Sequence, residues 1–381
     1  MLEQMVPFNR PHLTGHEFDY IQQAVSAGQL AGNGLFTKRC QEYLEHRLRA
    51  PRVLLTHSCT AALEMSALLL DLQHFDEVIM PSFTFVSTAN AFVLRGAVPV
   101  FVDIRPDTLN VDPHLVERAI TPRTRAIVVV HYAGVSCDME AINEIADRHN
   151  LSVIEDAAQA LGSTYQGRPL GSLGDLAAIS FHETKNVISG EGGALVINDP
   201  ELVERAEIIW EKGTDRSRFL RGQVDKYTWV DIGSSFLPGE LTAAFLWAQL
   251  EHLDQITEER LALWHHYFRA AEPLRSIGAQ LPYVPPDRAH NAHMFYVLIP
   301  EHLRQADVLR ELNRQNVNAI FHYVPLHSSP AGERYGRVRS PMTVTDDRSA
   351  RLVRLPLWVG MGADTPARVV SVLENTLDAM L

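Results

Sequence analysis

The sequence of 381 residues is poor in cysteine, with Cys40, Cys59 and Cys137 as its only three. So small and odd a number does not suggest a disulfide framework, and the spacing between them matches no metal site. His322 and His327 lie five positions apart, but no nearby acidic or cysteine side chain would complete a set of metal ligands. We therefore expect a protein of a reducing compartment that binds no metal.

The sequence also lacks long apolar runs and an excess of positive charge. No stretch approaches the roughly 20 apolar residues that a membrane-spanning helix needs. Glu3, Asn9 and Arg10 interrupt any signal-peptide pattern. Lysine and arginine number 34 against 46 acidic residues, which gives a net charge of −12. This balance argues against nucleic acid or a membrane as a partner, and we expect a cytoplasmic protein.

Short apolar runs that alternate with helical spacing are abundant in the first half of the chain. Strand-like runs and helical segments follow one another from residue 53 to residue 156. The expected strands are 53–56, 78–81, 98–104, 126–131 and 151–156, and the expected helices are 60–72, 87–94, 113–120 and 139–149. Strands that are apolar throughout and joined by helices predict a mostly parallel sheet covered by helices, in an α/β fold. Such sheets bind ligands at the carboxyl ends of their strands.

The second half of the chain has a different texture. A long helical pattern covers residues 240–271, followed by strand-like stretches at 293–299 and 318–324. Helical spacing returns at 305–313, 346–354 and 366–380. We predict a large domain at 1–250 and a smaller C-terminal α+β domain at 251–381, linked by the long helix at about 240–271.

Lys185 stands in a loop between two apolar runs, 176–179 and 194–197, with Ser180 before it and several glycines after it. Burial lowers the pKa of a lysine, and a neutral amine can attack a carbonyl to form a Schiff base. Taken alone, the stretch is better explained by a surface lysine on a turn, so a catalytic role for Lys185 depends on other motifs in the chain.

Three further features lie at the expected carboxyl ends of strands. Segment 56–62 places small and hydroxyl residues at a helix N-terminus, which suits a phosphate but also an ordinary helix cap. Asp156 ends an apolar strand and would pair with a cationic ring nitrogen, or equally with a helix end or a salt bridge. Phe85 would stack on a planar ring, although most aromatic residues at such places belong to the core.

Together these features describe one ligand. It carries a phosphate for the 57–60 turn, an aromatic ring for Phe85, a ring cation for Asp156 and an aldehyde for Lys185. Pyridoxal 5′-phosphate (PLP) has all four groups, and a lysine Schiff base with an acidic partner for the ring nitrogen is general to PLP enzymes.

The chain resembles the DegT/DnrJ/StrS family of nucleotide-sugar aminotransferases, a branch of the fold-type I PLP-dependent transferases. The resemblance covers nearly the whole length and rests on the segments SCTAAL (58–63), PSFTFVSTANA (81–91), VIEDAAQA (153–160), SFHETKN (180–186) and HYVPLH (322–327). It implies that Lys185 is the Schiff-base lysine and the acid/base of the proton shift, and that Asp156 pairs with the pyridinium nitrogen. The other implied contacts are Phe85 with the ring, Gln159 with the ring or its 3′ oxygen, Cys59, Thr60 and Ser180 with the phosphate, and His322, Tyr323 and His327 at the substrate mouth.

One departure from the family concerns the subunit interface. Many relatives carry a G-x-N-x-R-M segment whose asparagine reaches the phosphate of the neighbouring subunit. Here Ser235 stands at the position of that asparagine and Leu237 at that of the arginine. The resemblance implies a homodimer with active sites near the interface, while this contact from the partner is in doubt.

The resemblance implies a ping-pong reaction in which L-glutamate converts PLP to pyridoxamine 5′-phosphate and leaves as 2-oxoglutarate. SFHETKN, FLRGQVDKYTW (219–229) and NAHMFY (291–296) are shared more narrowly with members that aminate C4 of dTDP-4-keto-6-deoxy-D-glucose. The product would be dTDP-4-amino-4,6-dideoxy-D-galactose, for surface-polysaccharide synthesis. The alternatives are a different keto-sugar nucleotide, with another C4 epimer or a C3 ketone, and a non-catalytic sugar-nucleotide sensor. A sugar dehydratase of this family would have histidine in place of Lys185.

Overall fold

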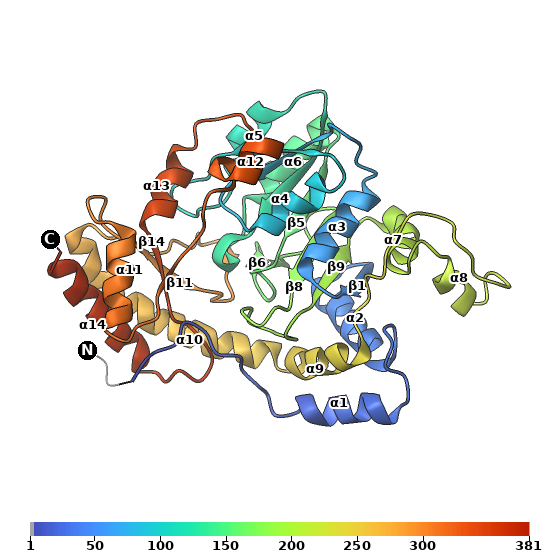
Figure 1. The fold of residues 1–381 in the computed structure, drawn as a ribbon, viewed down its shortest axis with the longest axis horizontal. Coiled ribbons are helices and arrows are strands. Elements are labelled where there is room, and N and C mark those ends of the chain that lie inside the picture. The colour runs from blue at the N-terminus through green and yellow to red at the C-terminus, as the bar shows by residue number, and fades with distance from the viewer. Residues whose placement is uncertain (1–3, 381) are drawn as a thin grey trace.

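The computed structural model describes residues 4–380, so residues 1–3 and 381 at the ends of the two predicted domains lie outside it (Figure 1). A central sheet of eight strands runs in the order β1-β9-β8-β5-β4-β2-β3-β13. Strands β3, β2, β4, β5 and β8 are parallel to one another, and β13 joins β3 in parallel at one edge. At the other edge β9 runs antiparallel to β8, and β1 runs antiparallel to β9. The sheet consists of β1 (Arg52–Thr56), β2 (Glu77–Pro81), β3 (Val98–Val102), β4 (Thr124–Val130), β5 (Ser152–Asp156), β8 (Leu176–Ser180), β9 (Gly193–Ile197) and β13 (Arg337–Val338).

Helices cover both faces of this sheet, as its uniformly apolar strands predict. Successive residues of β1 enter opposite cores, Val53 and Leu55 on one face and Leu54 on the other. The first core also contains residues of α2 (Leu35–Leu48), α5 (Pro113–Ala119), α6 (Met139–His149) and α9 (Glu240–Glu251). The second contains residues of α3 (Cys59–Leu69), α4 (Val86–Val93) and α7 (Val203–Trp210). The predicted α/β fold with a mostly parallel, helix-covered sheet is confirmed.

A smaller antiparallel sheet, in the order β11-β14-β12, lies in the C-terminal part of the chain. Its strands are β11 (Phe295–Leu298), β12 (Ile320–Phe321) and β14 (Leu352–Leu355). It shares a core with α10 (Leu253–Ala271), α11 (Gln305–Arg314) and α14 (Thr365–Asp378). The division into domains at residue 250 stays a prediction.

Three expectations for this half of the chain are wrong. The helix expected at 240–271 is two helices, α9 and α10, which lie end to end in Figure 1 and are separated at His252. The helix expected at 346–354 ends at Arg351, because the next four residues pair with β11 and β12 as strand β14. The strand expected at 318–324 is reduced to Ile320–Phe321.

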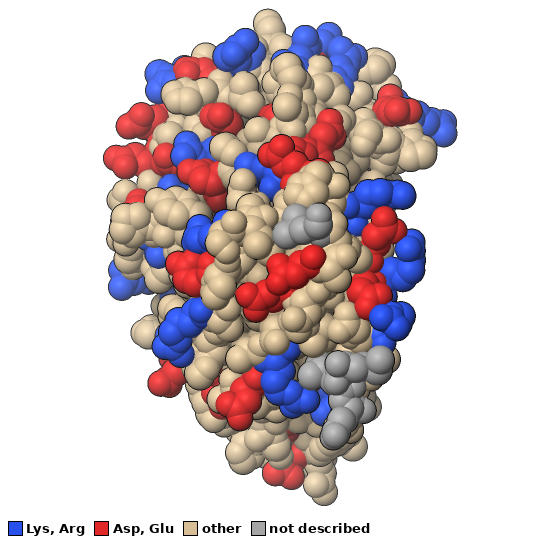
Figure 2. All heavy atoms as spheres, turned by 90° about the vertical axis from the view of Figure 1, so that its left-hand side faces the viewer, with Lys and Arg blue, Asp and Glu red and all other residues tan. Residues whose placement is uncertain are grey.

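The remaining elements are short or peripheral. They are α1 (Glu17–Ser26), α8 (Arg216–Leu220), α12 (Pro330–Tyr335), α13 (Thr343–Arg351), and the small sheet of β6 (Thr164–Tyr165), β7 (Arg168–Pro169) and β10 (Arg288–Ala289). Figure 2 views the side of the molecule that carries the C-terminal unit, where acidic and basic side chains are interspersed. No helix within residues 4–380 combines the length and apolar character needed to cross a bilayer.

Candidate active site

Asp156 lies at the carboxyl end of β5 and is only 5% exposed. Its Oδ2 atom accepts a hydrogen bond from Thr88 Oγ1 at 2.7 Å, and its Oδ1 atom accepts one from the Ala158 N–H at 3.1 Å. No lysine, arginine or histidine of residues 4–380 forms an ion pair with it. A buried carboxylate without a cationic partner is costly, so this site favours a ligand that brings a positive charge.

Lys185 lies in the loop between β8 and β9, as predicted, and its side chain is half-buried. Burial lowers its pKa, and the neighbouring Cys59 thiol and Asp156 carboxyl oppose this shift without cancelling it. Because Cys59 and Asp156 are near enough to influence the pKa of Lys185, the lysine, the carboxylate and the first turn of α3 belong to one site. A larger share of neutral amine makes Lys185 a better nucleophile than a surface lysine.

The N-terminus of α3 forms the third part of the site. The Oγ atom of the capping residue Ser58 accepts the Ala61 N–H at 3.1 Å, whereas the N–H groups of Cys59 and Thr60 have no partner among the described residues. Burial raises the pKa of the Cys59 thiol well above its ordinary value, so the thiol stays neutral. The arrangement offers two backbone donors and the positive end of the helix dipole to an anion.

The hydroxyl groups predicted for the phosphate lie along the same edge of the sheet. Thr60 Oγ1 is 2.7 Å from Ser87 Oγ, and Ser180 at the end of β8 pairs in register with Gly193 of β9. Gly193 passes so close to α3 that a Cβ atom added there would lie 2.4 Å from the backbone nitrogen of Cys59. The closeness of β9 to this turn therefore depends on glycine.

Gln159 and the 322–323 segment meet across the site. Gln159 Oε1 accepts the Ala133 N–H at 2.7 Å, and its Nε2 donates to the Tyr323 hydroxyl at 2.9 Å. His322 Nδ1 is 3.0 Å from the Tyr132 hydroxyl. Burial, together with the nearby charges of Arg354 and Lys185, lowers the pKa of His322 well below its ordinary value, so the ring is neutral.

Phe85 and His327 differ from the other predicted residues in their surroundings. Phe85 occupies the N-cap position of α4 and remains 57% exposed. His327 Nδ1 is 2.8 Å from Ser82 Oγ, and its Nε2 is 3.4 Å from Asp346 Oδ1. His327 thus ties the C-terminal segment to the end of β2 and has no hydrogen bond to the residues around Lys185 that the structure describes. Ser235, at the departure from the family pattern, is exposed.

The described residues fit the cofactor that the sequence predicts. A carboxylate that lacks a cation, an amine with a lowered pKa and a helix N-terminus with unpaired N–H groups match the ring nitrogen, the aldehyde and the phosphate of PLP. PLP therefore accounts for each of these groups.

Comparison with known proteins identifies the family. Residues 11–374 match the DegT/DnrJ/EryC1/StrS aminotransferase family. The chain belongs to this family. It is 31% identical to the spore coat polysaccharide biosynthesis protein SpsC of Bacillus subtilis, over 97% of this chain and 96% of the relative. It is also 31% identical to the GDP-perosamine synthase of Caulobacter vibrioides, over 96% of this chain and 97% of the relative.

The fold of this aminotransferase agrees with that of solved family members. DesI, whose structure was determined in the presence of its TDP-sugar product, superimposes with a TM-score of 0.88 at 29% identity, covering 99% of this chain and 94% of that one. The chain is therefore a PLP-dependent nucleotide-sugar aminotransferase with the fold-type I architecture.

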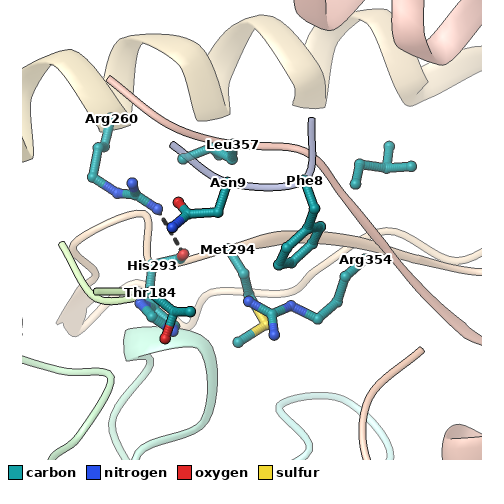
Figure 3. Close-up of a pocket in the computed structure, with 9 residues that line it drawn as sticks. Phe8, Asn9, Thr184, Arg260, His293, Met294, Arg354 and Leu357 are labelled. Carbon is teal, nitrogen blue, oxygen red and sulfur yellow. Dashed lines mark hydrogen bonds between the residues drawn. The ribbon is translucent and has the colours of Figure 1, made fainter. Parts of the chain in front are cut away.

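A group of residues beside Lys185 in this aminotransferase was not predicted from the sequence. A pocket adjoins the lysine loop at Thr184, and Figure 3 shows Arg260 and Arg354 directed into it from different elements. Arg354 was not predicted as a site residue because it was expected on a helix, whereas it lies on strand β14. His293 lies within NAHMFY, which carried the resemblance without suggesting a role. The pocket is lined by Phe8, Asn9, Thr184, Arg260, His293, Met294, Arg354, Leu355 and Leu357.

Proposed function

We propose that this enzyme transfers the amino group of L-glutamate to C4 of dTDP-4-keto-6-deoxy-D-glucose, in the reaction of dTDP-4-amino-4,6-dideoxygalactose transaminases. The products are dTDP-4-amino-4,6-dideoxy-D-galactose and 2-oxoglutarate, and the pathway is surface-polysaccharide synthesis. The observation that carries the catalytic part is that one site contains both an amine of lowered pKa, Lys185, and a buried carboxylate without an ion-pair partner among residues 4–380, Asp156.

Each site residue has a role in this proposal. When bound, PLP supplies an electron sink for the electrons of the donor's α-carbon. Lys185 Nζ takes the proton from that carbon and later returns one to C4 of the sugar. Asp156 holds a proton on the ring nitrogen, and Thr88 fixes the orientation of the Asp156 carboxylate. The N–H groups of Cys59 and Thr60, with Ser180, bind the phosphate.

The remaining predicted residues define the walls of the site. Phe85 covers the ring, and Gln159 contacts its face or its 3′ oxygen while holding Tyr323 by a hydrogen bond. His322, Tyr323 and His327 form the substrate mouth. The exposure of Phe85 is consistent with a homodimer in which a second subunit covers this edge of the site.

The choice of sugar rests on the narrow sequence resemblance and on DesI, whose structure was determined in the presence of its TDP-sugar product. A second candidate is a GDP-linked 4-keto sugar, because a GDP-perosamine synthase is 31% identical to this chain. The two candidates share every residue role above and differ in the nucleotide and in the sugar that it carries.

The test is an absorbance experiment on purified enzyme loaded with PLP. We expect L-glutamate to remove the visible absorption of the lysine-bound cofactor. After excess glutamate is removed, dTDP-4-keto-6-deoxyglucose restores that absorption, and NMR of the product gives the configuration at C4. Restoration only by a GDP-linked 4-keto-6-deoxy sugar favours the second candidate. Absence of any response to glutamate contradicts the catalytic proposal and revives the sugar-nucleotide sensor.

A further inference from the structure

Asn186, the residue that follows Lys185, is held at both polar atoms of its side chain and is only 8% exposed. Its Nδ2 atom donates a hydrogen bond to the carbonyl oxygen of Asn291 at 2.8 Å, and its Oδ1 atom is 3.0 Å from His293 Nδ1. Because a carbonyl oxygen can only accept, the orientation of the amide is fixed and Oδ1 faces the histidine. The lysine loop is thereby joined to residues 291–293, which we call the clasp and which precede strand β11.

The same contacts fix the tautomer of His293. The oxygen of Asn186 carries no hydrogen, so Nδ1 of His293 must be the donor between them. Burial, followed by the nearby charge of Lys185, lowers the pKa of His293 well below its ordinary value, so the ring is neutral and has a single N–H group. That N–H group is therefore committed to Asn186, and the Nε2 atom carries no hydrogen.

Asn291 connects the clasp to the chain that follows Asp156. Its Nδ2 atom donates to the carbonyl oxygens of Gln159 and Leu161, both at 2.9 Å. Its Oδ1 atom accepts the N–H of His293 at 3.1 Å, so the clasp is also tied within itself. The residue that holds Asn186 is thus the same one that holds the segment directly after strand β5.

The backbone of the clasp is fixed from a third side by Arg260 of helix α10. Its Nε and Nη2 atoms donate to the carbonyl oxygens of Ala292 and His293 at 3.1 and 2.7 Å, and Figure 3 shows the second of these bonds. Ala292 has a φ of 50°, a left-handed conformation that residues other than glycine seldom adopt. Such conformations persist where the surroundings determine them, and they concentrate at functional sites.

The clasp limits where the backbone of Lys185 can lie. On one side of the lysine, its N–H group donates to the carbonyl oxygen of His182 at 2.9 Å. On the other side, the planar peptide unit that joins it to Asn186 leaves few backbone dihedrals free. Asn9 also donates to the loop, at the carbonyl oxygen of Glu183, but that contact is exposed. Because the side chain of a lysine is a flexible four-carbon stem, the place of its amine depends on how the base of the stem is held.

We propose that Asn186, held by the clasp, is a positioning residue that sets where the amine of Lys185 lies relative to the carboxylate of Asp156. The inference rests on the proposed role of Lys185 and adds the groups that hold this lysine in place. Reacting atoms must approach to about 3–3.5 Å in alignment, and a displacement of about 1 Å can lower a rate by about 100-fold. Asn291 contacts both Asn186 and the segment after Asp156, so it relates the amine to the carboxylate.

The first test separates positioning from cofactor binding. 4-Deoxypyridoxine 5′-phosphate has the ring nitrogen and the phosphate of PLP but lacks the aldehyde, so it binds without reacting with Lys185. We expect the Asn186→Ala apoprotein to bind this analogue within about threefold of wild type, because its phosphate and ring contacts are intact. The condensation of PLP with the lysine amine, which releases water and is followed by stopped-flow absorbance, should be about 10–100-fold slower. Condensation at the wild-type rate, or analogue binding weakened by the same factor, overturns the proposal.

Substitutions of His293 identify the nitrogen that matters. The Nδ2 atom of an asparagine can take the place of His293 Nδ1, whereas the Nε2 atom of a glutamine reaches the place of His293 Nε2. We expect His293→Asn to keep the condensation rate within about threefold of wild type, and His293→Gln to slow it about as much as Asn186→Ala does. The reverse order overturns the proposal, because Nε2 and not the bond to Asn186 would then be responsible.

Asn198→Ala is the matched control for lost stability. Asn198 Nδ2 donates to the carbonyl oxygens of Gly171 and Gly174 at 3.1 and 2.8 Å, and Asn198 follows the end of β9 that lies away from the site. Both asparagine variants lose two hydrogen bonds, so we expect both apoproteins to unfold at a lower temperature than wild type. Only Asn186→Ala should slow the condensation. An equal slowing in Asn198→Ala would overturn the proposal, since lost stability would then explain the effect.

Turnover supplies a second readout and separates this inference from the function on which it rests. A displaced amine impairs proton transfer more than donor binding, so kcat of Asn186→Ala should fall by about 10–100-fold while KM for L-glutamate stays within about threefold. A change confined to KM overturns the positioning role. If Lys185→Ala keeps the absorption of the lysine-bound cofactor, the proposed role of Lys185 fails. If Lys185→Ala loses it and Asn186→Ala matches wild type, only the positioning inference fails.

Discussion

The side-chain amide of Gln159 donates a hydrogen bond to the hydroxyl of Tyr323 at 2.9 Å. Gln159 follows strand β5 of the large sheet, whereas Tyr323 follows β12 of the small sheet, 164 positions further along the chain. Because the oxygen of the same amide accepts the Ala133 N–H, both polar atoms of the Gln159 side chain are held in place. The two sheets are thus joined at the site itself.

Tyr323→Phe tests this link. The substitution leaves the Gln159 Nε2 atom without its acceptor, and an unsatisfied buried donor costs about 1–3 kcal/mol. We expect the free energy of unfolding to fall by that amount in urea denaturation of the PLP-loaded enzyme. Tyr283→Phe is the control because Tyr283 is exposed, and it should match wild type. A Tyr323→Phe protein as stable as wild type would mean that water replaces the hydroxyl.

Lys185→Ala removes the amine on which the proposed chemistry depends. We expect turnover with glutamate and the keto-sugar to fall by at least about 10³-fold, because a positioned acid/base contributes about 10²–10⁴-fold and the nucleophile is lost as well. The visible absorption of the lysine-bound cofactor should disappear, while free amines added to the solution should restore part of the activity. Lys38→Ala, on the exposed side of α2, serves as the control. Substantial turnover by Lys185→Ala would remove this lysine from the mechanism.

Asp156→Asn tests the carboxylate at the end of β5. An amide of the same shape keeps the hydrogen bond of Thr88 in reach but cannot balance a ring cation. We expect kcat to fall by about 10²–10³-fold, which is the usual effect of removing one electrostatic stabiliser. Asp19→Asn, an exposed change on α1, should leave kcat unchanged. Near-normal kcat in Asp156→Asn would argue against pairing with the ring nitrogen.

Glu155→Gln tests a neighbouring carboxylate that stabilises the fold through hydrogen bonds. Burial alone would raise the pKa of Glu155, but hydrogen bonds from His131 and from the N–H groups of Gly174 and Gly171 lower it below 4.5. Its stabilising contribution is therefore complete above pH 4.5 and is lost as the pH falls through the lowered pKa. We expect the variant to be less stable by about 3 kcal/mol at pH 7.

The pH dependence supplies the control for Glu155→Gln. The difference in free energy of unfolding between wild type and variant should be largest near pH 5–6 and should shrink below about pH 4, where Glu155 takes up a proton. It should also shrink as the pH rises above about 6.5, because Glu155 helps to raise the pKa of its partner His131 to about 9 and that stabilisation is lost as His131 is deprotonated. Glu144→Gln, on the exposed face of α6, should differ little from wild type at either pH. A difference that stays constant down to pH 3 would show that shape, rather than charge, stabilises this position.

Glu155 and Asp156 illustrate what the sequence could predict about the site. Both are acidic, both end the same apolar strand, and both are buried. The order of motifs selected Asp156, but only the structure shows the difference: four donors surround Glu155, and no cation accompanies Asp156. Satisfaction of hydrogen bonds is a property of chain segments brought together by folding, so periodicity does not reveal it.

The fold was predictable where local pattern and tertiary structure agree. The βα units from residue 52 to residue 156 follow from apolar runs and helical spacing, and their observed bounds differ from the predicted ones by a few residues. Arg354 was assigned to a helix because residues 346–354 have helical spacing. Backbone pairing of Leu352–Leu355 with two distant strands overrides that preference, and it also directs the arginine into the pocket.

The close approach of Gly193 to Cys59 also limits how this enzyme can vary. The end of β9 and the first turn of α3 are nearly in contact, so the width of the anion-binding turn depends on the missing side chain of a residue eight positions after Lys185. Even a methyl group there would push the helix away from the sheet. We therefore expect residue 193 to remain glycine among variants selected for activity on new sugars. Changes should accumulate at the proposed substrate mouth, which is built from side chains and not from closely packed backbone.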